Sequence, residues 1–364
     1  MARARHRQVT LTTGTRRSKN VESPASYNFC VATIRVLHFG LGPIGASILR
    51  LVFERPGFKV VGGVDVDPAK VGRDLGEVAE LPRRIGIKVS NDPVKALKAA
   101  KPDVVVLCTS SSLPGVLPQI ETILKSKTAI VSTTEELAYP AFTHASEARK
   151  IHAWATKAKV AVLGTGVNPG YAMDALPIAL TAVCDRVDRV TVNRVQDARI
   201  RRLPFQQKIG AGLTRTQFQQ QVKKGSVRHV GLTESIAMIA DALGWKLERI
   251  TDRIEPKIAT VPVSGELLAV DPGYVCGIVQ DGAGYRSGKA VIRLHMEAYL
   301  GAPESYDAIE IAGSPALSMK IAGGIHGDVA TAAIVVNSIP TVLRATPGLH
   351  TMRDLPLPSF FPGR

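Results

Sequence analysis

The sequence has few cysteines and no long apolar run. Its four cysteines, Cys30, Cys108, Cys184 and Cys276, lie far apart in the 364-residue chain without a CxxC pair, which argues against a disulfide framework or a zinc site. No uninterrupted apolar stretch approaches the roughly 20 residues that a membrane span needs. None of the eight histidines stands at a metal-ligand spacing from another ligand, so no metal is predicted. We therefore expect a cytoplasmic protein with no membrane partner.

Acidic residues are also scarce, at 31 against 46 Lys and Arg, which gives a formal net charge of +15. Residues 1–32 are predicted to be a basic, disordered tail; a transit peptide or a start placed too early are the alternatives. The other basic residues are scattered and match no nucleic-acid motif. Attraction of an anionic cofactor or acidic substrate explains them as well, so we expect no nucleic-acid partner. A tail that binds nucleic acid remains a competing hypothesis.

Glycines are placed where a dinucleotide would need them. The run IRVLHFGLGPIG passes from an apolar strand into a GxGxxG turn, in which Gly40 makes the tight turn, Gly42 lets the backbone approach a diphosphate and Gly45 packs against the strand. A second apolar run ends at Asp65, twenty residues after Gly45, where an acid is expected at the ribose hydroxyls. The residues assigned to the cofactor here are Gly40, Leu41, Gly42, Pro43, Ile44, Gly45, Asp65 and Arg73.

The cofactor is predicted to be NADP or NAD. Asp65 favours the free ribose hydroxyls of NADH and repels a 2′-phosphate, whereas Lys70 and Arg73 follow closely and could offset that repulsion.

The pattern of apolar runs predicts an α/β protein with two sheets. Strands and helices alternate over residues 33–166, which predicts a Rossmann domain with a doubly wound parallel sheet. Residues 167–322 are expected to form a second α+β domain of open antiparallel or mixed sheet, used for substrate and dimerisation. Residues 323–364 are expected to supply a buried C-terminal helix and a tail that return to the domain junction.

Two adjacent carboxylates, Glu135 and Glu136, directly follow a predicted buried strand in the segment STTEEL. A carboxylate at that edge of the sheet could hold an ammonium or iminium group and exchange protons with it. The alternative is that both glutamates begin a helix, where acids complement the helix dipole. The spacing alone favours neither.

Other polar side chains stand at the ends of predicted strands. Thr109, Ser110, Ser111, Thr133 and Asn168 are assigned to the cofactor, although local turns explain such residues too. The residues assigned to the substrate pocket are Tyr171, Met173, His229 and His326. Arg201, Arg202, Lys208 and Arg215 could capture a substrate carboxylate or form a solvated face.

Several motifs together resemble the family of 2,4-diaminopentanoate dehydrogenases and native amine dehydrogenases, which is related in fold to dihydrodipicolinate reductases. They are GLGPIG, GVDVDPAKVGRDLGE, STTEELAYP, GTGVNPGYAMDAL, HVGLTESIAMIADALGW and GGIHGDVATAAIVVNSIP with PGLHTM. The resemblance implies a homodimer that uses NADH or NADPH to aminate ketones or aldehydes with ammonia. It also implies that a glutamate of the EEL motif, Glu135 first and Glu136 second, binds the amine and shuttles protons before the iminium is reduced.

Two alternatives compete with this interpretation. Dihydrodipicolinate reductases resemble one another in a His-His-x-x-Lys stretch followed by DAPSGT, but the corresponding region here reads VQDARIRRLPFQQKIGAG. A reductase of that kind, acting on an imine, is therefore disfavoured. A non-catalytic nucleotide sensor would keep the glycine-rich unit without turnover.

Overall fold

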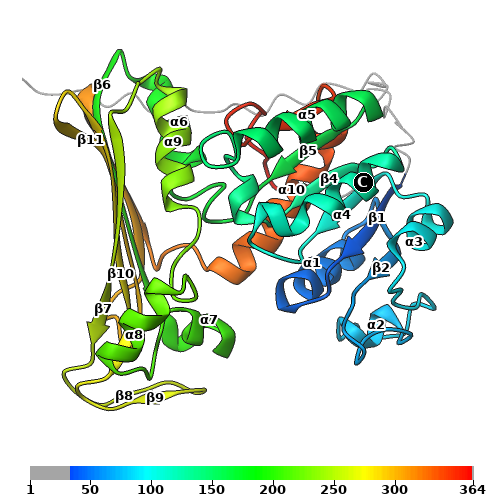
Figure 1. The fold of residues 1–364 in the computed structure, drawn as a ribbon, viewed down its shortest axis with the longest axis horizontal. Coiled ribbons are helices and arrows are strands. Elements are labelled where there is room, and N and C mark those ends of the chain that lie inside the picture. The colour runs from blue at the N-terminus through cyan, green and yellow to red at the C-terminus, as the bar shows by residue number, and fades with distance from the viewer. Residues whose placement is uncertain (1–32, 363–364) are drawn as a thin grey trace, which may run out of the picture. The chain divides into compact units, whose positions relative to one another are not determined.

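The structure is a computed structural model that describes residues 33–362, so the predicted tail of residues 1–32 lies outside the described residues. From Thr33 onward the chain forms one compact unit. Two six-stranded sheets organise it (Figure 1). The α/β fold class predicted from the sequence is thereby confirmed.

The first sheet is parallel, in the order β14-β5-β4-β3-β1-β2. Its strands are β1 (Ile34–Phe39), β2 (Phe58–Val64), β3 (Val104–Leu107), β4 (Ala129–Ser132), β5 (Ala161–Gly164) and β14 (Gly348–His350). Its helices are α1 (Pro43–Glu54), α2 (Leu75–Val78), α3 (Pro93–Ala100), α4 (Leu113–Lys125), α5 (Ala145–Ala158) and α10 (Gly327–Arg344). The strand order reverses between β1 and β3, which is where ligands bind in open α/β sheets.

Both faces of this sheet are covered. The core that contains α1 and α10 lies on one face, and the core that contains α3, α4 and α5 lies on the other. The strands β3, β4 and β5 are accordingly buried at every residue, as their uninterrupted apolar sequences predict. Asp92 caps α3 by accepting a hydrogen bond from the backbone N–H of Lys95, as its place before Pro93 predicts.

The second sheet is mixed, in the order β13-β12-β6-β11-β10-β7. Its strands are β6 (Arg186–Asp197), β7 (Arg249–Ile258), β10 (Val275–Arg286), β11 (Lys289–Tyr299), β12 (Tyr306–Ser314) and β13 (Leu317–Ala322). Only β6 and β11 pair in parallel, and the other neighbours are antiparallel. A separate hairpin joins β8 (Val263–Ser264) and β9 (Ala269–Val270).

Helices cover the face of the second sheet that is turned toward the first (Figure 1). They are α6 (Ala175–Leu180), α7 (Leu203–Lys208), α8 (Arg215–Lys223) and α9 (Leu232–Ala242), with the 3₁₀ turns η2 (Thr181–Val183) and η3 (Ala198–Ile200). A further 3₁₀ turn, η1 (Glu135–Leu137), follows β4. We call the first sheet with its helices the first half of the molecule, and the second sheet with its helices the second half.

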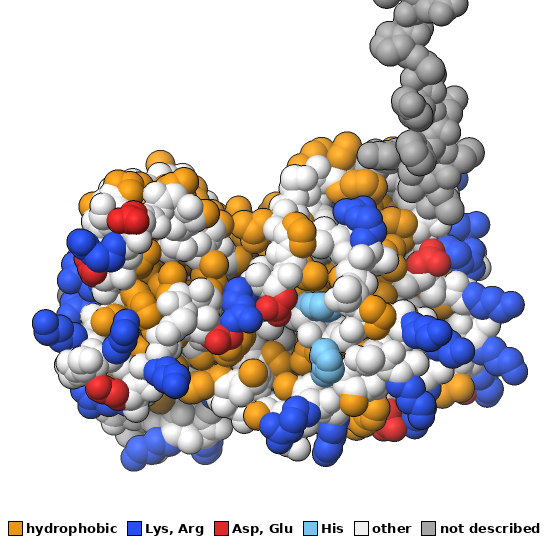
Figure 2. Space-filling model, turned by 90° about the horizontal axis from the view of Figure 1, so that it is seen from above, with side chains coloured by type: hydrophobic (Ala, Val, Ile, Leu, Met, Phe, Trp, Pro, Cys, Tyr) orange, Lys and Arg blue, Asp and Glu red, His pale blue; other side chains and the backbone are white. Residues whose placement is uncertain are grey.

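The C-terminal segment is part of the first half of the molecule. Helix α10 packs against α1, and β14 extends the first sheet beside β5. On the face seen in Figure 2, Lys and Arg side chains are spread over the surface rather than gathered in one stripe. Across residues 33–362, no helix is both long and apolar enough to cross a membrane.

Candidate active site

A cavity of about 450 Å³ opens between the two sheets, at the carboxyl ends of β1, β3, β4 and β5. The segments that follow β1, β3, β4 and β5 contribute the lining residues Gly42, Pro43, Ile44, Gly45, Cys108, Thr109, Ser110, Ser111, Thr133, Glu135, Gly166, Val167, Asn168 and Pro169. The second half contributes Arg194, Gln196, Arg201, Arg202, Pro204, Phe205, Lys208, Ile209, Arg228, His229, Ile278, Met296 and Ala298. The start of α10 adds Gly327, Asp328 and Thr331.

The glycine-rich loop forms one end of this cavity and has room for a diphosphate. Gly40 has φ +94°, and a Cβ on Gly45 would lie 2.1 Å from the Gly40 carbonyl oxygen, so both positions require glycine. A Cβ on Gly42 would meet nothing within 4 Å, which leaves open space directly above the N-terminus of α1. The free N–H groups and positive end of that helix suit an anion, so the loop fits a dinucleotide cofactor.

Asp65 lies at the end of β2, beside the loop rather than in the cavity lining. Its carboxylate accepts hydrogen bonds from the backbone N–H groups of Leu41, at 2.8 Å, and Asp67, at 2.9 Å, and Lys70 Nζ lies 3.4 Å away. Partial burial acts in the opposite direction, but these bonds and the lysine charge hold the pKa of Asp65 below its usual value. Gly40 and Leu41 also lie behind the cavity wall, and Arg73 is exposed.

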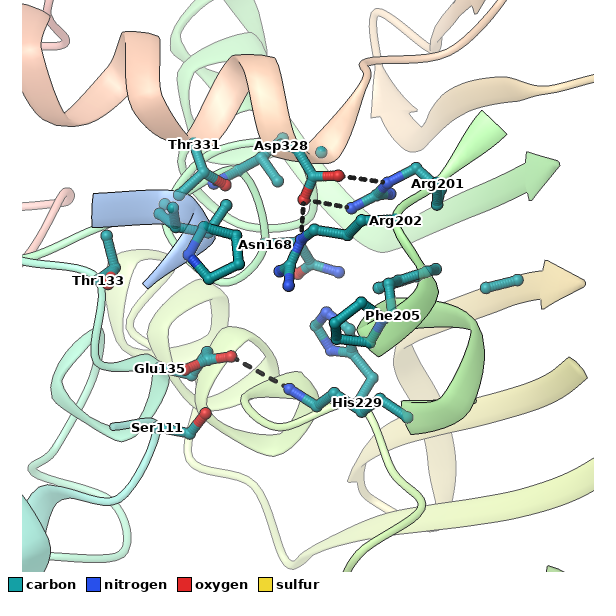
Figure 3. A pocket seen from close by; sticks show the side chains of 18 of the residues that line it. Ser111, Thr133, Glu135, Asn168, Arg201, Arg202, Phe205, His229, Asp328 and Thr331 are labelled. Atoms are coloured by element: carbon teal, nitrogen blue, oxygen red, sulfur yellow. Dashed lines mark hydrogen bonds and ion pairs between the residues drawn. The ribbon is translucent and has the colours of Figure 1, made fainter. Parts of the chain in front are cut away.

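The two glutamates of the EEL segment point in different directions. Glu135 lines the cavity, and its Oε1 lies 3.4 Å from Lys208 Nζ (Figure 3). Glu136 lies outside the lining; its Oε2 accepts a hydrogen bond from the backbone N–H of Leu113, the first residue of α4, at 2.8 Å. His144 and Arg228 complete its surroundings at 3.1 and 3.5 Å. Glu136 therefore serves the start of α4, and Glu135 is the carboxylate that faces the cavity.

Asn168 offers the cavity an acceptor that lacks a hydrogen bond. The Asn168–Pro169 peptide bond is cis, and the Asn168 side chain is almost fully buried. Its amide nitrogen lies 3.1 Å from the Met173 sulfur, whereas its Oδ1 has no hydrogen-bond partner among the described residues. Unsatisfied buried polar atoms are costly, and Asn168 is one of the residues that line the cavity, so its Oδ1 is a candidate acceptor for a ligand's N–H group.

His229 presents a neutral imidazole to the same cavity. Burial, with the charges of Lys208, Arg194 and Arg201, lowers the pKa of His229 to about 3. Its Nδ1 is buried and also lacks a partner within residues 33–362. The backbone of His229 is fixed to β10, because the Gln280 side chain accepts from its N–H at 3.0 Å and donates to its carbonyl at 3.1 Å.

The remaining predicted residues are divided between the cavity wall and the core. Thr109, Ser110, Ser111 and Thr133 line the cavity with the loop residues. Met173 is buried beneath Asn168, and Tyr171 packs against the core of the first half. The side chain of His326 caps α10 by accepting from the Val329 N–H at 3.5 Å, and only its neighbours Gly327 and Asp328 reach the lining. Arg215 is exposed at the start of α8.

Sequence reasoning missed several lining residues of the second half. Arg194 and Gln196 lie on the buried face of β6 with Val190 and Val192, and Arg194 forms an ion pair with Asp307. A charged residue in phase with buried valines along one strand was the available signal. Asp328 accepts hydrogen bonds from both Arg201 and Arg202, as Figure 3 shows, but it lies more than 120 residues away in the chain.

Comparison with known proteins finds two family models. The model described as the 2,4-diaminopentanoate dehydrogenase C-terminal domain matches residues 171–363, and the model described as the dihydrodipicolinate reductase N-terminus matches residues 34–162.

Two curated relatives cover most of the chain. A 2,4-diaminopentanoate dehydrogenase of Acetoanaerobium sticklandii is 34% identical, over 89% of this chain and 94% of that protein. An amine dehydrogenase of Streptomyces virginiae is 25% identical, over 89% of this chain and 96% of that protein.

Solved structures share the fold. The amine dehydrogenase of Mycobacterium smegmatis superposes with a TM-score of 0.82 at 23% identity, covering 92% of this chain and 99% of that one. A dihydrodipicolinate reductase of Paenisporosarcina sp. TG-14 gives a TM-score of 0.52 at 15% identity, over 88% and 97% of the two chains.

Proposed function

This chain belongs to the 2,4-diaminopentanoate dehydrogenase family, and on that premise we propose that it is an NAD(P)-dependent amine dehydrogenase. It would aminate a ketone or aldehyde with ammonia and, in the reverse direction, deaminate an amine oxidatively. The observation that carries the proposal is the position of Glu135, a carboxylate that opens into the same cavity as the glycine-rich loop. A dihydrodipicolinate reductase is disfavoured because residues 195–212, which include α7, contain neither the paired His nor the DAPSGT loop of that family's diacid site.

A nicotinamide cofactor supplies the two-electron redox chemistry of such a reaction when bound. Gly42 and the N-terminus of α1 would hold its diphosphate, and Asp65 would hold its adenosine ribose. Ser110, Ser111 and Thr133 line the same cavity and offer hydroxyl groups to the cofactor, and Thr109 lies beside them with its hydroxyl donated to Gln119 Oε1 at 2.6 Å. The open space above Gly42 supports this assignment.

Glu135 would bind the amine and move its protons. As a carboxylate it attracts an ammonium ion, and by accepting one proton it leaves neutral ammonia able to attack the carbonyl carbon. The same proton can then pass to the hydroxyl of the carbinolamine, which leaves as water. The iminium that results is positively charged, so the ionised Glu135 beside it stabilises it.

Three other parts of the wall suit this chemistry. Asn168 Oδ1 and the neutral His229 can accept hydrogen bonds from the amine. Ile278, Met296 and Ala298 give the cavity apolar surface, which strengthens the charge interaction by excluding water. These residues support a site for a small amine or carbonyl substrate.

Substitution of Glu135 tests the proposal. Glu135→Gln keeps the shape and removes the negative charge, so we expect amination of small ketones with ammonium to fall at least about 100-fold, in the range typical for lost acid-base catalysis. Cofactor binding, followed by fluorescence, should stay near the wild-type value. Glu266→Gln, at an exposed position, is the matched control. Full amination by Glu135→Gln would contradict the proposal, and tight cofactor binding with no turnover by the wild type would favour a nucleotide sensor.

For cofactor choice we propose use of both NAD and NADP. Asp65 favours NAD, whereas Lys70 lies between Asp65 and Asp67, 3.4 and 3.3 Å from their carboxylates, where it can also meet a 2′-phosphate. Lys70→Ala should therefore lower kcat/KM for NADPH about tenfold and leave that for NADH within about twofold. Lys59→Ala, an exposed lysine on β2, is the control. Equal losses with both cofactors would contradict this role.

The assembly and the regions of the chain are also proposals. The family resemblance supports a cytoplasmic homodimer, which light scattering coupled to gel filtration tests directly. The regions we propose are 33–166 for the dinucleotide, 167–322 for substrate and dimerisation, and 323–364 for the returning helix and tail.

A further inference from the structure

Lys208 occupies the side of Glu135 that faces the second half of the molecule. Its Nζ lies 3.4 Å from Glu135 Oε1, and the dashed line from Glu135 in Figure 3 marks this ion pair. Glu135 comes from η1, after β4, and Lys208 is the last residue of α7. The two side chains are 24% and 39% exposed, so both are open to the cavity they line. A lysine ammonium group therefore lies against the carboxylate that we propose receives a substrate ammonium group.

The position of Lys208 is built into the fold. The neighbouring Gln206 is fully buried, and its Nε2 donates to the carbonyls of Ala198 and Arg201, each at 2.9 Å. Ile209, which follows Lys208, is buried in the core of the second half. Because residues on both sides of Lys208 are anchored, its backbone is fixed beside the cavity that its side chain lines.

The other charged groups around this cavity already have partners. Arg228 lies 3.5 Å from Glu136, Arg194 pairs with Asp307, and Arg201 and Arg202 pair with Asp328. His229 is uncharged near neutral pH, because its pKa is about 3. Within the described part of the chain, Lys208 is therefore the cation that forms an ion pair with Glu135.

We propose that Lys208 is a positioning residue that acts through Glu135. It holds the carboxylate turned into the cavity before the amine arrives, and it then competes with the incoming ammonium ion for that carboxylate. This inference rests on the proposed function, because it assumes that Glu135 binds the amine. Two effects follow from removing the lysine charge: the Glu135 carboxylate loses the contact that orients it, and ammonium meets no competitor.

Kinetics of Lys208→Met test both effects, since methionine keeps the apolar stem and loses the charge. We expect KM for ammonium to fall about two- to fivefold, the range for a partly exposed ion pair, with a smaller change in kcat. Lys208→Arg should return both values toward the wild type, and Lys223→Met, at an exposed position on α8, is the matched control.

A second measurement needs neither cofactor nor turnover. Infrared difference spectra of the protein alone, recorded against Glu135→Gln at one neutral pH, report the carboxylate stretching bands of Glu135. These bands should shift in Lys208→Met, because the contact of Lys208 Nζ with Glu135 Oε1 is lost. Lys208→Gln repeats the experiment if the methionine variant does not fold.

The outcomes separate this inference from the proposed function. If Lys208→Met matches Lys223→Met in KM for ammonium and in its infrared bands, the role of Lys208 is overturned while Glu135 keeps its own. If Glu135→Gln still aminates ketones, the proposed function itself is overturned, whatever Lys208 does.

Discussion

Arg201 and Asp328 form a two-bond ion pair between the two halves of the molecule. Arg201 Nε and Nη2 donate to the Asp328 carboxylate at 3.1 and 3.0 Å, and Arg202 Nε adds a third bond at 3.1 Å. The Arg201 side chain is only 7% exposed, and its guanidinium also lies over the Phe205 ring, 4.1 Å from the centroid. Asp328 belongs to α10, which packs on α1, so the pair fixes the start of that helix to η3.

Breaking this pair is predicted to destabilise the protein. Asp328→Asn leaves the buried Arg201 guanidinium without a counter-charge, so we expect the free energy of unfolding to fall by about 3 kcal/mol, as for other buried pairs that lose one partner. Chemical denaturation measures it. Asp188→Asn, which breaks an exposed pair with Arg186, should cost less than about 0.5 kcal/mol. Equal effects of the two substitutions would show that the pair across the cavity is not structural.

Alanine substitutions of Gly42 and Gly45 are predicted to have different effects on stability and on cofactor affinity. A methyl group on Gly42 meets nothing within 4 Å, and its φ of −67° suits alanine, so Gly42→Ala should keep the stability of the wild type. That methyl group would occupy the space proposed for the diphosphate, and cofactor affinity should fall at least about tenfold. Gly45→Ala would place its Cβ 2.1 Å from the Gly40 oxygen and should destabilise the fold itself. Thermal unfolding and cofactor titration of both variants check this, and unchanged affinity in Gly42→Ala would contradict the cofactor assignment.

Glu136 is predicted to contribute to the free energy of unfolding and not to the amination reaction. Glu136→Ala removes the acceptor for the Leu113 N–H and the neighbour of His144 and Arg228, so unfolding should become easier by about 1–2 kcal/mol. The folded variant should still aminate ketones, in contrast to Glu135→Gln. Denaturation and steady-state rates measured on the same preparation separate the two effects. Loss of amination in a stable Glu136→Ala protein would mean that the amine-binding acid is assigned to the wrong residue.

The free energy of unfolding is predicted to decrease as pH is lowered, because of His38. This histidine is fully buried in β1, both ring nitrogens lack partners among the described residues, and burial lowers its pKa to about 3. Since the unfolded chain binds a proton near pH 6.5 and the folded one does not, the folded state loses about 1.4 kcal/mol per pH unit between roughly pH 6 and pH 3.

His38→Leu removes this titration and is its test. The difference in unfolding free energy between wild type and variant should change by about 2 kcal/mol from pH 7 to pH 5, with the wild type losing more. His350→Leu, at the surface-facing end of the sheet, is a control that lacks the buried imidazole. A constant difference across this pH range would rule out the contribution of His38.

Local sequence signals predicted much of the fold but not which neighbouring side chain faces the cavity. The strands before Gly40, Cys108 and Thr133 are predominantly apolar in sequence, and the glycine spacing predicted the loop between β1 and α1. Glu135 and Glu136 could not be separated, because their directions depend on η1 and on the start of α4, which comes from a segment some 20 residues earlier.

Residues that meet only through the tertiary fold were beyond local reasoning. Asp328 reaches Arg201 because α10 packs on α1, although the two residues lie far apart in the sequence. No periodic pattern in the sequence predicts this contact. His326 was a reasonable pocket candidate by composition, yet its side chain is used to cap α10 while Asp328, two residues on, lines the cavity. The open acceptors on Asn168 and His229 could be recognised only once their surroundings were known.

The pairing of β14 with β5 has a consequence for biosynthesis. Strand β5 is complete at Gly164, but its partner does not emerge from the ribosome until Gly348–His350 have been made. Until then a nascent chain carries an apolar strand with one uncovered edge, a situation in which chains readily pair with the wrong neighbour. The first sheet can therefore be completed only near the end of synthesis.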